Sequence, residues 1–330
     1  MLGAGSWGTA LAAHLATADR DVTLWARDPQ LAAEMTTGRA NPRYLPGVAL
    51  GPSIRITASL SESLDAAELV LLAVPSHGLR AVIRDAAPAL PPGVVLVSAT
   101  KGLETETLAR MSEVVAGETG GRHPVVVLSG PSFASEVVRR LPTALVVAST
   151  DEQAVRLVQQ ELKSGSLRLY GSDDVAGVEI GAALKNVIAI AAGVVEALDL
   201  GRNALAALIT RGLAEMSRLA TAMGGRRETL AGLSGLGDLV LTCTGELSRN
   251  RRVGLELGRG RPLDAILDDM RMVAEGIRTT SAALALGQRH GVELPIAAQM
   301  AEVLAGRQTP TQAVGCLMLR PQRGESDGGS

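Results

Sequence analysis

The spacing of apolar and polar residues divides the chain into two parts. Before about residue 172, short apolar runs alternate with longer stretches in which apolar residues recur at helical spacing, for example 79–90 and 151–162. The runs predict strands at 21–25, 54–57, 69–74, 94–98, 125–129, 144–148 and 167–170. Near-continuous apolar strands that alternate with helices indicate a doubly wound, mostly parallel sheet covered on both faces. This pattern predicts an α/β domain over residues 1–172.

After about residue 173 only the helical spacing remains. It predicts helices at 175–198, 204–223, 226–233, 237–243, 250–257, 262–270, 279–290 and 296–304. We therefore expect an all-helical domain over 173–320. The segment 321–330 ends in a polar stretch rich in Gly and Ser, and we expect it to be a disordered tail.

One predicted helix, over 177–198, carries a row of small residues. Gly177, Gly181 and Lys185 are spaced by four, so they share a face, where glycine allows another backbone or a ligand to come close. Lys185 and the following Asn186 are candidates for proton transfer or carbonyl polarisation, since a desolvated lysine changes its pKa readily. The alternative is tight helix packing, with the lysine reaching out to water.

A glycine motif opens the chain. Gly3, Gly5 and Gly8 form the pattern GxGxxG around Ser6 and Trp7, directly before a helix rich in small residues. Such a loop places a pyrophosphate at a helix N-terminus, and it is followed here by a predicted strand. The first domain is therefore predicted to be of the Rossmann type and to bind a dinucleotide.

The end of the strand predicted at 21–25 bears on the choice of cofactor. Arg27 lies 19 residues beyond Gly8, near the position that reads the adenosine ribose. A guanidinium suits a 2′-phosphate, which favours NADP(H) while leaving NAD(H) possible. In the alternative interpretation, Arg27 lies in a solvated loop and Asp28 caps the next helix.

The first strand of the sheet is short, because only Met1 and Leu2 precede Gly3. Two residues span at most about 7 Å, against about 17–20 Å for a typical strand. We expect unpaired backbone groups in the neighbouring strands, a natural protein with an apolar N-terminal extension, and weak NADPH binding by the chain as given.

Three loops follow predicted strands where ligands bind to sheets of this kind, at their carboxyl ends. Their sequences are PSH at 75–77, ATKG at 99–102 and SGPSFA at 129–134. Each could also be ordinary turn chemistry.

Composition excludes several other classes of protein. The net charge of −2 offers no general attraction for nucleic acid or anionic membranes. No apolar run reaches the ~18 residues of a membrane-spanning helix, and no signal peptide precedes the first motif. Two distant cysteines and four histidines without paired spacing predict neither a disulfide nor a metal site. We expect a cytoplasmic protein that acts on a small molecule and leave its oligomeric state open, with a homodimer as one candidate.

Together the motifs carry a family resemblance. GAGSWGTALA, PSH, ATKGLE, SGPSFA, GAALKNVIAIAAG, NALAALITRGLAEM, GLGDLVLTCTGELSRNRR and VAEG occur in this order over about residues 1–305. The chain closely resembles bacterial NAD(P)-dependent sn-glycerol-3-phosphate dehydrogenase. The resemblance implies interconversion of dihydroxyacetone phosphate and sn-glycerol 3-phosphate, which supplies phospholipid synthesis.

The resemblance also implies roles for individual residues. Lys185 would transfer the proton, and Asp238 would hold the Lys185 side chain in place. Residues expected at the substrate are Lys101, Gly130, Ser132, Lys185, Asn186, Asp238, Thr242, Ser248, Arg249 and Asn250. Residues expected at the cofactor are Gly3, Gly5, Ser6, Trp7, Gly8, Arg27, Lys101, Ala134, Arg249, Val273 and Glu275.

General chemistry agrees with these roles. A carbonyl that accepts hydride needs positive charge and a proton at its oxygen, and a phosphate needs arginine and main-chain amides.

Two other functions stay open at this point. One is a dehydrogenase of the same plan that acts on a hydroxy acid, which would need a carboxylate-binding arrangement at 248–250. The other is a regulator that senses NADP(H) without turnover, which would need neither Lys185 nor Asp238.

Overall fold

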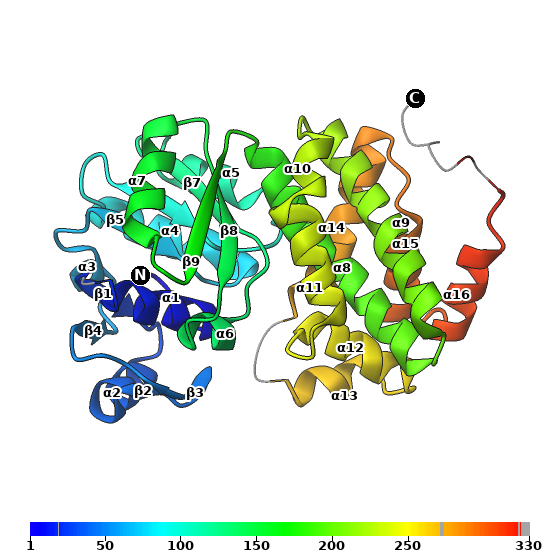
Figure 1. The fold of residues 1–330 in the computed structure, drawn as a ribbon, viewed down its shortest axis with the longest axis horizontal. Helices are drawn as coiled ribbons and strands as arrows, with labels where there is room; N and C mark the ends of the chain where they lie inside the picture. The colour runs from blue at the N-terminus through cyan, green and yellow to red at the C-terminus, as the bar shows by residue number, and fades with distance from the viewer. Residues whose placement is uncertain (19, 271–273, 323, 325–330) are drawn as a thin grey trace. The chain divides into compact units, whose positions relative to one another are not determined.

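The chain forms two compact units. The structure, a computed structural model, describes residues 1–18, 20–270, 274–322 and 324. The first unit comprises Met1–Lys101 and Met111–Val175, and the second comprises Gly102–Arg110 and Ala176–Ser330. Of the predicted tail, 323 and 325–330 lie outside the described residues. Each unit is described by itself below (Figure 1).

The first unit is built on a mostly parallel sheet, as predicted. Its strands are β1 (Val22–Trp25), β4 (Ile54–Thr57), β5 (Leu69–Leu72), β6 (Val95–Ser98), β7 (Val125–Ser129), β8 (Thr143–Ala148) and β9 (Leu167–Ser172). β1 pairs with β4, and β5 to β9 follow one another in order. All of these pairs are parallel except β7 with β8.

Leu2 connects the two parts of this sheet. It forms parallel bridges to Trp25 at the end of β1 and to Leu72 at the end of β5. Its N–H donates to the carbonyl of Leu71 at 2.8 Å, and its own carbonyl accepts from Ala73 at 2.8 Å. The expectation of unpaired neighbours is therefore wrong for the carboxyl-terminal residues of β1 and β5, which the first residues of the chain reach.

Helices cover both faces of the sheet (Figure 1). On one side His14 of α1 (Ser6–Ala16) hydrogen bonds through Nε2 to the Leu162 carbonyl of α7 (Glu152–Leu162) at 2.9 Å. α4 (Ser76–Ala86) and α5 (Met111–Glu118) form a second pair, which Glu118 joins by ion pairs. The remaining elements are α2 (Pro29–Gly38), α3 (Leu60–Leu64), a 3-10 turn (Ala87–Ala89), α6 (Ala134–Val138) and the antiparallel hairpin of β2 (Ala40–Asn41) and β3 (Leu45–Ala49). The hairpin was not predicted from the sequence.

The second unit is helical and packs around α8 (Val175–Ala197) (Figure 1). The other helices are α9 (Gly201–Ala222), α10 (Arg227–Ala231), α11 (Asp238–Thr244), α12 (Arg249–Gly258), α13 (Leu263–Asp268), α14 (Glu275–His290), α15 (Pro295–Leu304) and α16 (Pro310–Met318). A π-helical turn, η2 (Leu233–Gly237), runs directly into α11. By length and composition α8 could cross a membrane, but it is buried in this unit, as the core helix of a folded domain is.

Residues 102–110 belong to the second unit although first-unit residues flank them in the sequence. Leu103 is buried in the core of the helical unit, and Arg110 forms an ion pair with Glu179 of α8 at 2.6 Å. The sequence pattern contains no sign of this placement, because the segment is too short to show a period.

Candidate active site

Lys185 is buried inside the helical unit. It is 6% exposed, and its Nζ donates to Oδ1 of Asp238 at 2.5 Å and to Oγ1 of Thr242 at 2.9 Å. Thr242 in turn donates to the main-chain oxygen of Asp238, one helical turn earlier, at 2.6 Å. The alternative in which the lysine reaches out to water is therefore wrong. A buried ammonium fixed against a carboxylate can polarise a carbonyl and deliver a proton.

The glycines before Lys185 are explained by helix packing. A Cβ on Gly181 would lie 2.8 Å from the main-chain oxygen of Ser234 in the π-helical turn. A Cβ on Gly225 would lie 2.8 Å from the backbone of Gly177. The close approach indicated by the sequence is thus made by protein backbone. π-Helical turns often occur at functional sites, and this one ends where Asp238 begins α11.

Two asparagine side chains link three helices beside Lys185. Gly276 at the start of α14 donates its N–H to Oδ1 of Asn250 at 3.0 Å, and Nδ2 of Asn250 donates to Oδ1 of Asn186 at 2.9 Å. The hydrogen bonds fix the orientation of both amides, so that Asn186 keeps its NH₂ group as a donor. A Cβ on Gly276 would lie 2.6 Å from the Asn186 carbonyl and 2.8 Å from Asn250 Oδ1, so this position requires glycine.

The N-terminus of α12 has the features of an anion site. Ser248 caps the helix, with its Oγ accepting from the N–H of Arg251 at 3.2 Å. Arg249 is exposed, yet enough protein surrounds its guanidinium that desolvation lowers its pKa, against the raising effect of Glu275. Arg251 pairs instead with Glu196 at 2.5 Å. A helix N-terminus next to a guanidinium suits a phosphate.

The glycine loop of the first unit fits a dinucleotide. Gly3 has a φ of 113°, which favours glycine, and a Cβ on Gly8 would overlap the Gly3 carbonyl oxygen. Gly5 faces open space, with no atom within 4 Å of the place that a Cβ would take, and as N-cap of α1 it provides no side-chain cap. The three glycines thus make a tight turn, leave room for a pyrophosphate and pack the helix closely, in that order. Nε1 of Trp7 is buried without a hydrogen-bond partner among the described residues.

The loops at the carboxyl ends of β6 and β7 meet at one carbonyl. The Gly130 oxygen accepts from Nζ of Lys101 at 3.0 Å and from Oγ of Ser132 at 3.2 Å. Gly130 has a φ of 128°, and a Cβ there would lie 3.1 Å from Cα of Leu145. Ala134 begins α6, which packs on α1. The structure therefore brings Lys101, Gly130 and Ser132 together.

At the ribose end, Arg27 is exposed and, in the part of the chain that the structure describes, makes no hydrogen bond or ion pair. Asp28 caps α2 by accepting a hydrogen bond from the N–H of Gln30 at 2.9 Å. This helix cap was expected in the alternative interpretation of residues 27 and 28.

The predicted site residues consequently fall into two groups, one in each unit. Glu275 is the first residue of α14, next to the amide link. Val273 lies outside the described residues. Among the described residues there is no group of three or more His, Cys, Asp or Glu side chains that could hold a metal ion.

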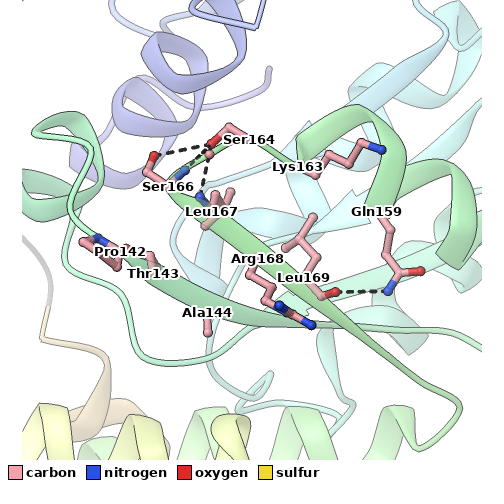
Figure 2. Close-up of a pocket in the computed structure, with 11 residues that line it drawn as sticks. Pro142, Thr143, Ala144, Gln159, Lys163, Ser164, Ser166, Leu167, Arg168 and Leu169 are labelled. Atoms are coloured by element: carbon pink, nitrogen blue, oxygen red, sulfur yellow. Dashed lines mark hydrogen bonds between the residues drawn. The ribbon is translucent and has the colours of Figure 1, made fainter.

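A cavity of about 610 Å³ lies elsewhere in the first unit, along β8 and β9 (Figure 2). Its lining residues include Pro142, Lys163, Ser164 and Arg168, and none of the predicted site residues. Ser164 and Gln159 bind main-chain groups of β9 there, which blunts the edge of the sheet. We therefore do not assign the chemistry to this cavity.

Sequence reasoning missed three residues near these sites: Asn41, Gly276 and Arg43, the last of which pairs with Asp28 at 2.5 Å. Asn41 is fully buried, and its Nδ2 donates to the carbonyl of Ala4 in the glycine loop and to Thr9 Oγ1, both at 2.8 Å. The only available signal was the turn-forming pair Asn41-Pro42, which does not reveal a partner distant in the sequence. Gly276 follows Glu275 in the VAEG motif and could have been selected with it.

Comparison with known proteins gives consistent matches over the whole chain. Two family models match: NAD-dependent glycerol-3-phosphate dehydrogenase N-terminus over residues 1–155, and the C-terminus of the same family over 174–315. The chain is 51% identical over 333 residues to a protein of Acidobacterium capsulatum named glycerol-3-phosphate dehydrogenase [NAD(P)+], covering 98% of each. It is 50% identical to a protein of that name from Geobacter sulfurreducens, again covering 98% of each.

A solved structure agrees with these matches. The crystal structure of glycerol-3-phosphate dehydrogenase from Coxiella burnetii aligns with a TM-score of 0.93 at 42% identity, covering 97% of this chain and 98% of that one.

Proposed function

Because the chain belongs to the NAD-dependent glycerol-3-phosphate dehydrogenase family, we propose that it interconverts dihydroxyacetone phosphate and sn-glycerol 3-phosphate with NAD(P)(H). The observation that carries the proposal is the buried Lys185–Asp238 pair, at 2.5 Å, in the same helical unit as the Arg249 anion site. The first holds a proton and positive charge, and the second suits the phosphate of the substrate. A sensor without turnover has no need of the first feature.

In the reducing direction, NAD(P)H held at the glycine loop would supply the hydride that the carbonyl carbon of dihydroxyacetone phosphate accepts. The Lys185 ammonium stabilises the negative charge that develops on the carbonyl oxygen and gives that oxygen a proton, which completes the alcohol. The lysine then regains a proton from water. Asp238 holds the ammonium in place throughout, while the Thr242 hydroxyl fixes its direction.

Substrate orientation follows from the remaining groups of the helical unit. The N-terminus of α12 and the Arg249 guanidinium would bind the phosphate. The NH₂ group of Asn186, whose direction the Asn250 amide sets, would donate to a substrate oxygen. Holding the phosphate and the oxygen at fixed positions raises the rate by orientation as well as by charge.

The first unit would bind the cofactor. We assign the pyrophosphate to the glycine loop and α1 N-terminus, and the adenosine 2′-phosphate of NADP(H) to Arg27. Residues 1–172 would then be the dinucleotide-binding domain and 173–320 the substrate domain. Supply of glycerol 3-phosphate to phospholipid synthesis and a cytoplasmic location remain predictions, and a homodimer remains one candidate for the oligomeric state. Light scattering on the purified protein tests the last of these.

The direct test follows NADPH absorbance in the presence of dihydroxyacetone phosphate and then repeats the assay with NADH. We expect turnover with both cofactors and a higher kcat/KM with NADPH. A hydroxy-acid dehydrogenase would instead reduce the corresponding 2-oxo acid and ignore dihydroxyacetone phosphate. Absence of turnover with every carbonyl substrate, together with tight NADPH binding, would favour the sensor.

A further inference from the structure

An acidic residue at the position that commonly reads the cofactor ribose is already engaged by the protein. Asp28 lies 20 residues after Gly8, where an Asp or Glu commonly binds the ribose hydroxyls of NAD(H). Here its Oδ1 accepts from the N–H of Gln30 at 2.9 Å, and its Oδ2 accepts from Nη1 of Arg43 at 2.5 Å. Both carboxylate oxygens thus have a partner within the protein.

Arg43 is held in this position from several sides. Its Nη2 donates to Glu34 of α2 at 3.0 Å. The turn that carries it is fixed by Asn41, whose Oδ1 accepts from the N–H of Tyr44 at 3.0 Å. The same Asn41 side chain donates to the Ala4 carbonyl between the first two glycines of the cofactor loop. The turn, the loop and the start of α2 are therefore tied together within the first unit.

The charges of the two groups oppose each other at this position. A carboxylate favours ribose hydroxyls and repels a 2′-phosphate, whereas an arginine nearby accommodates the phosphate. The N–H of Gln30 and the guanidinium of Arg43 lower the pKa of Asp28, so the carboxylate stays charged and its field is offset by Arg43. The side chains of Asp28 and Arg43 are 46% and 35% exposed, so the pair is accessible to a bound cofactor.

We propose that Arg43 is a positioning residue for cofactor choice: by occupying and neutralising Asp28, it removes the repulsion of the NADP(H) 2′-phosphate and leaves Arg27 to bind it. Its role is distinct from that of Arg27, because Arg43 acts through the carboxylate. The inference rests on the proposed use of a nicotinamide dinucleotide. Binding of NADPH by the wild-type protein tests that premise separately from the variants.

The test is a fluorescence titration of NADPH and NADH, without substrate, on four variants and the wild type. Arg43→Ala should weaken NADPH by at least ~10-fold and leave NADH unchanged or tighter, since it frees a carboxylate that discriminates between the two. Arg55→Ala is the matched control. Arg55 is another arginine of the first unit, bonded to Thr23 Oγ1 and to the Glu62 carbonyl, so its removal changes net charge equally. It should leave the ratio of the two affinities unchanged.

The decisive comparison removes the carboxylate as well. Asn is as good an N-cap as Asp, so Asp28→Asn should keep the start of α2. The double variant Asp28→Asn with Arg43→Ala should bind NADPH within ~3-fold of Asp28→Asn alone, because the interaction energy of the pair disappears with either partner. Two results would overturn the proposal: an unchanged affinity ratio in Arg43→Ala, or a double variant that keeps the full loss of NADPH affinity. An unchanged melting temperature in Arg43→Ala is expected, because exposed ion pairs add little stability.

Discussion

Replacing Asp238 with alanine should reveal how much the buried ion pair contributes to the stability of the helical unit. The side chains of Lys185 and Asp238 are only 7% and 1% exposed. Removing one partner of such a pair leaves an uncompensated buried charge, which costs about 3–5 kcal/mol. That is a large part of the roughly 5–15 kcal/mol by which a folded domain is stable.

Removing both charges should cost less than this single change. In the double variant Lys185→Met with Asp238→Ala neither charge of the pair remains buried. The Thr242 hydroxyl still donates to the main-chain oxygen of residue 238, as it does now at 2.6 Å, so this hydroxyl keeps a partner. We therefore expect the double variant to be more stable than Asp238→Ala by at least ~2 kcal/mol, because it no longer buries the unpaired lysine charge, which costs about 3–5 kcal/mol.

Urea unfolding followed by circular dichroism measures these differences, and a second ion pair supplies the control. Arg307 and Glu302, also in the helical unit, are 2.7 Å apart but are 62% and 35% exposed. Arg307→Ala should cost no more than about 1 kcal/mol, the usual range for exposed pairs. If Asp238→Ala were no more destabilising than Arg307→Ala, or if the double variant were no more stable than Asp238→Ala, the argument from burial would be wrong.

Three further predictions concern the helical unit. Arg249→Ala should reduce kcat/KM for dihydroxyacetone phosphate by a factor that corresponds to roughly 2–4 kcal/mol. Arg249→Lys should reduce it less, because lysine keeps the charge but loses the forked contact. Wild-type kinetics in both variants would show that the Arg249 side chain is solvated. Gly276→Ala should raise the substrate KM, because its Cβ meets the Asn186 carbonyl and Asn250 Oδ1; an unchanged KM and melting temperature would contradict the close packing. Burial raises the pKa of Glu215 from 4.5 to about 7, more than its hydrogen bonds from the start of α15 lower it. The folded state therefore binds its proton more tightly, and the resulting stability of about 3 kcal/mol is present below pH 4.5 and lost as the pH rises through about 7. Urea midpoints at about pH 5 and about pH 8 should differ more in the wild type than in Glu215→Gln, and equal differences would refute the assignment.

Much of the architecture could be predicted because it depends on local patterns. Buried parallel strands are continuous apolar runs, and helices repeat every 3.6 residues. The sheet of the first unit and the helical character of the second could therefore be predicted from the sequence. The direction of β8 was not predictable, since a strand pairs parallel or antiparallel with the same residues. The β2–β3 hairpin was also missed, because its first strand, Ala40–Asn41, is too short to show alternation.

The contacts that shape the sites depend on residues far apart in the sequence. Asp238 could be named as the partner of Lys185 only through the family resemblance, because 53 positions separate the two residues. The amide link between Asn186 and Asn250 spans 64 positions. The hydrogen bond from Asn41 to the glycine loop spans 37 positions, and no sequence motif predicted it. A polar residue carries no sign of its partner in its local pattern, so such links require the folded chain.

The most direct test of this mechanism is the turnover of Lys185→Ala with NADPH and dihydroxyacetone phosphate. We predict that kcat falls by at least ~10²-fold, the usual contribution of a positioned proton donor. The affinity for NADPH, measured by fluorescence titration on the same protein, should remain close to that of the wild type, because the glycine loop and Arg27 belong to the other unit. Near-normal turnover in a folded Lys185→Ala protein would contradict the assignment of proton transfer to this buried lysine.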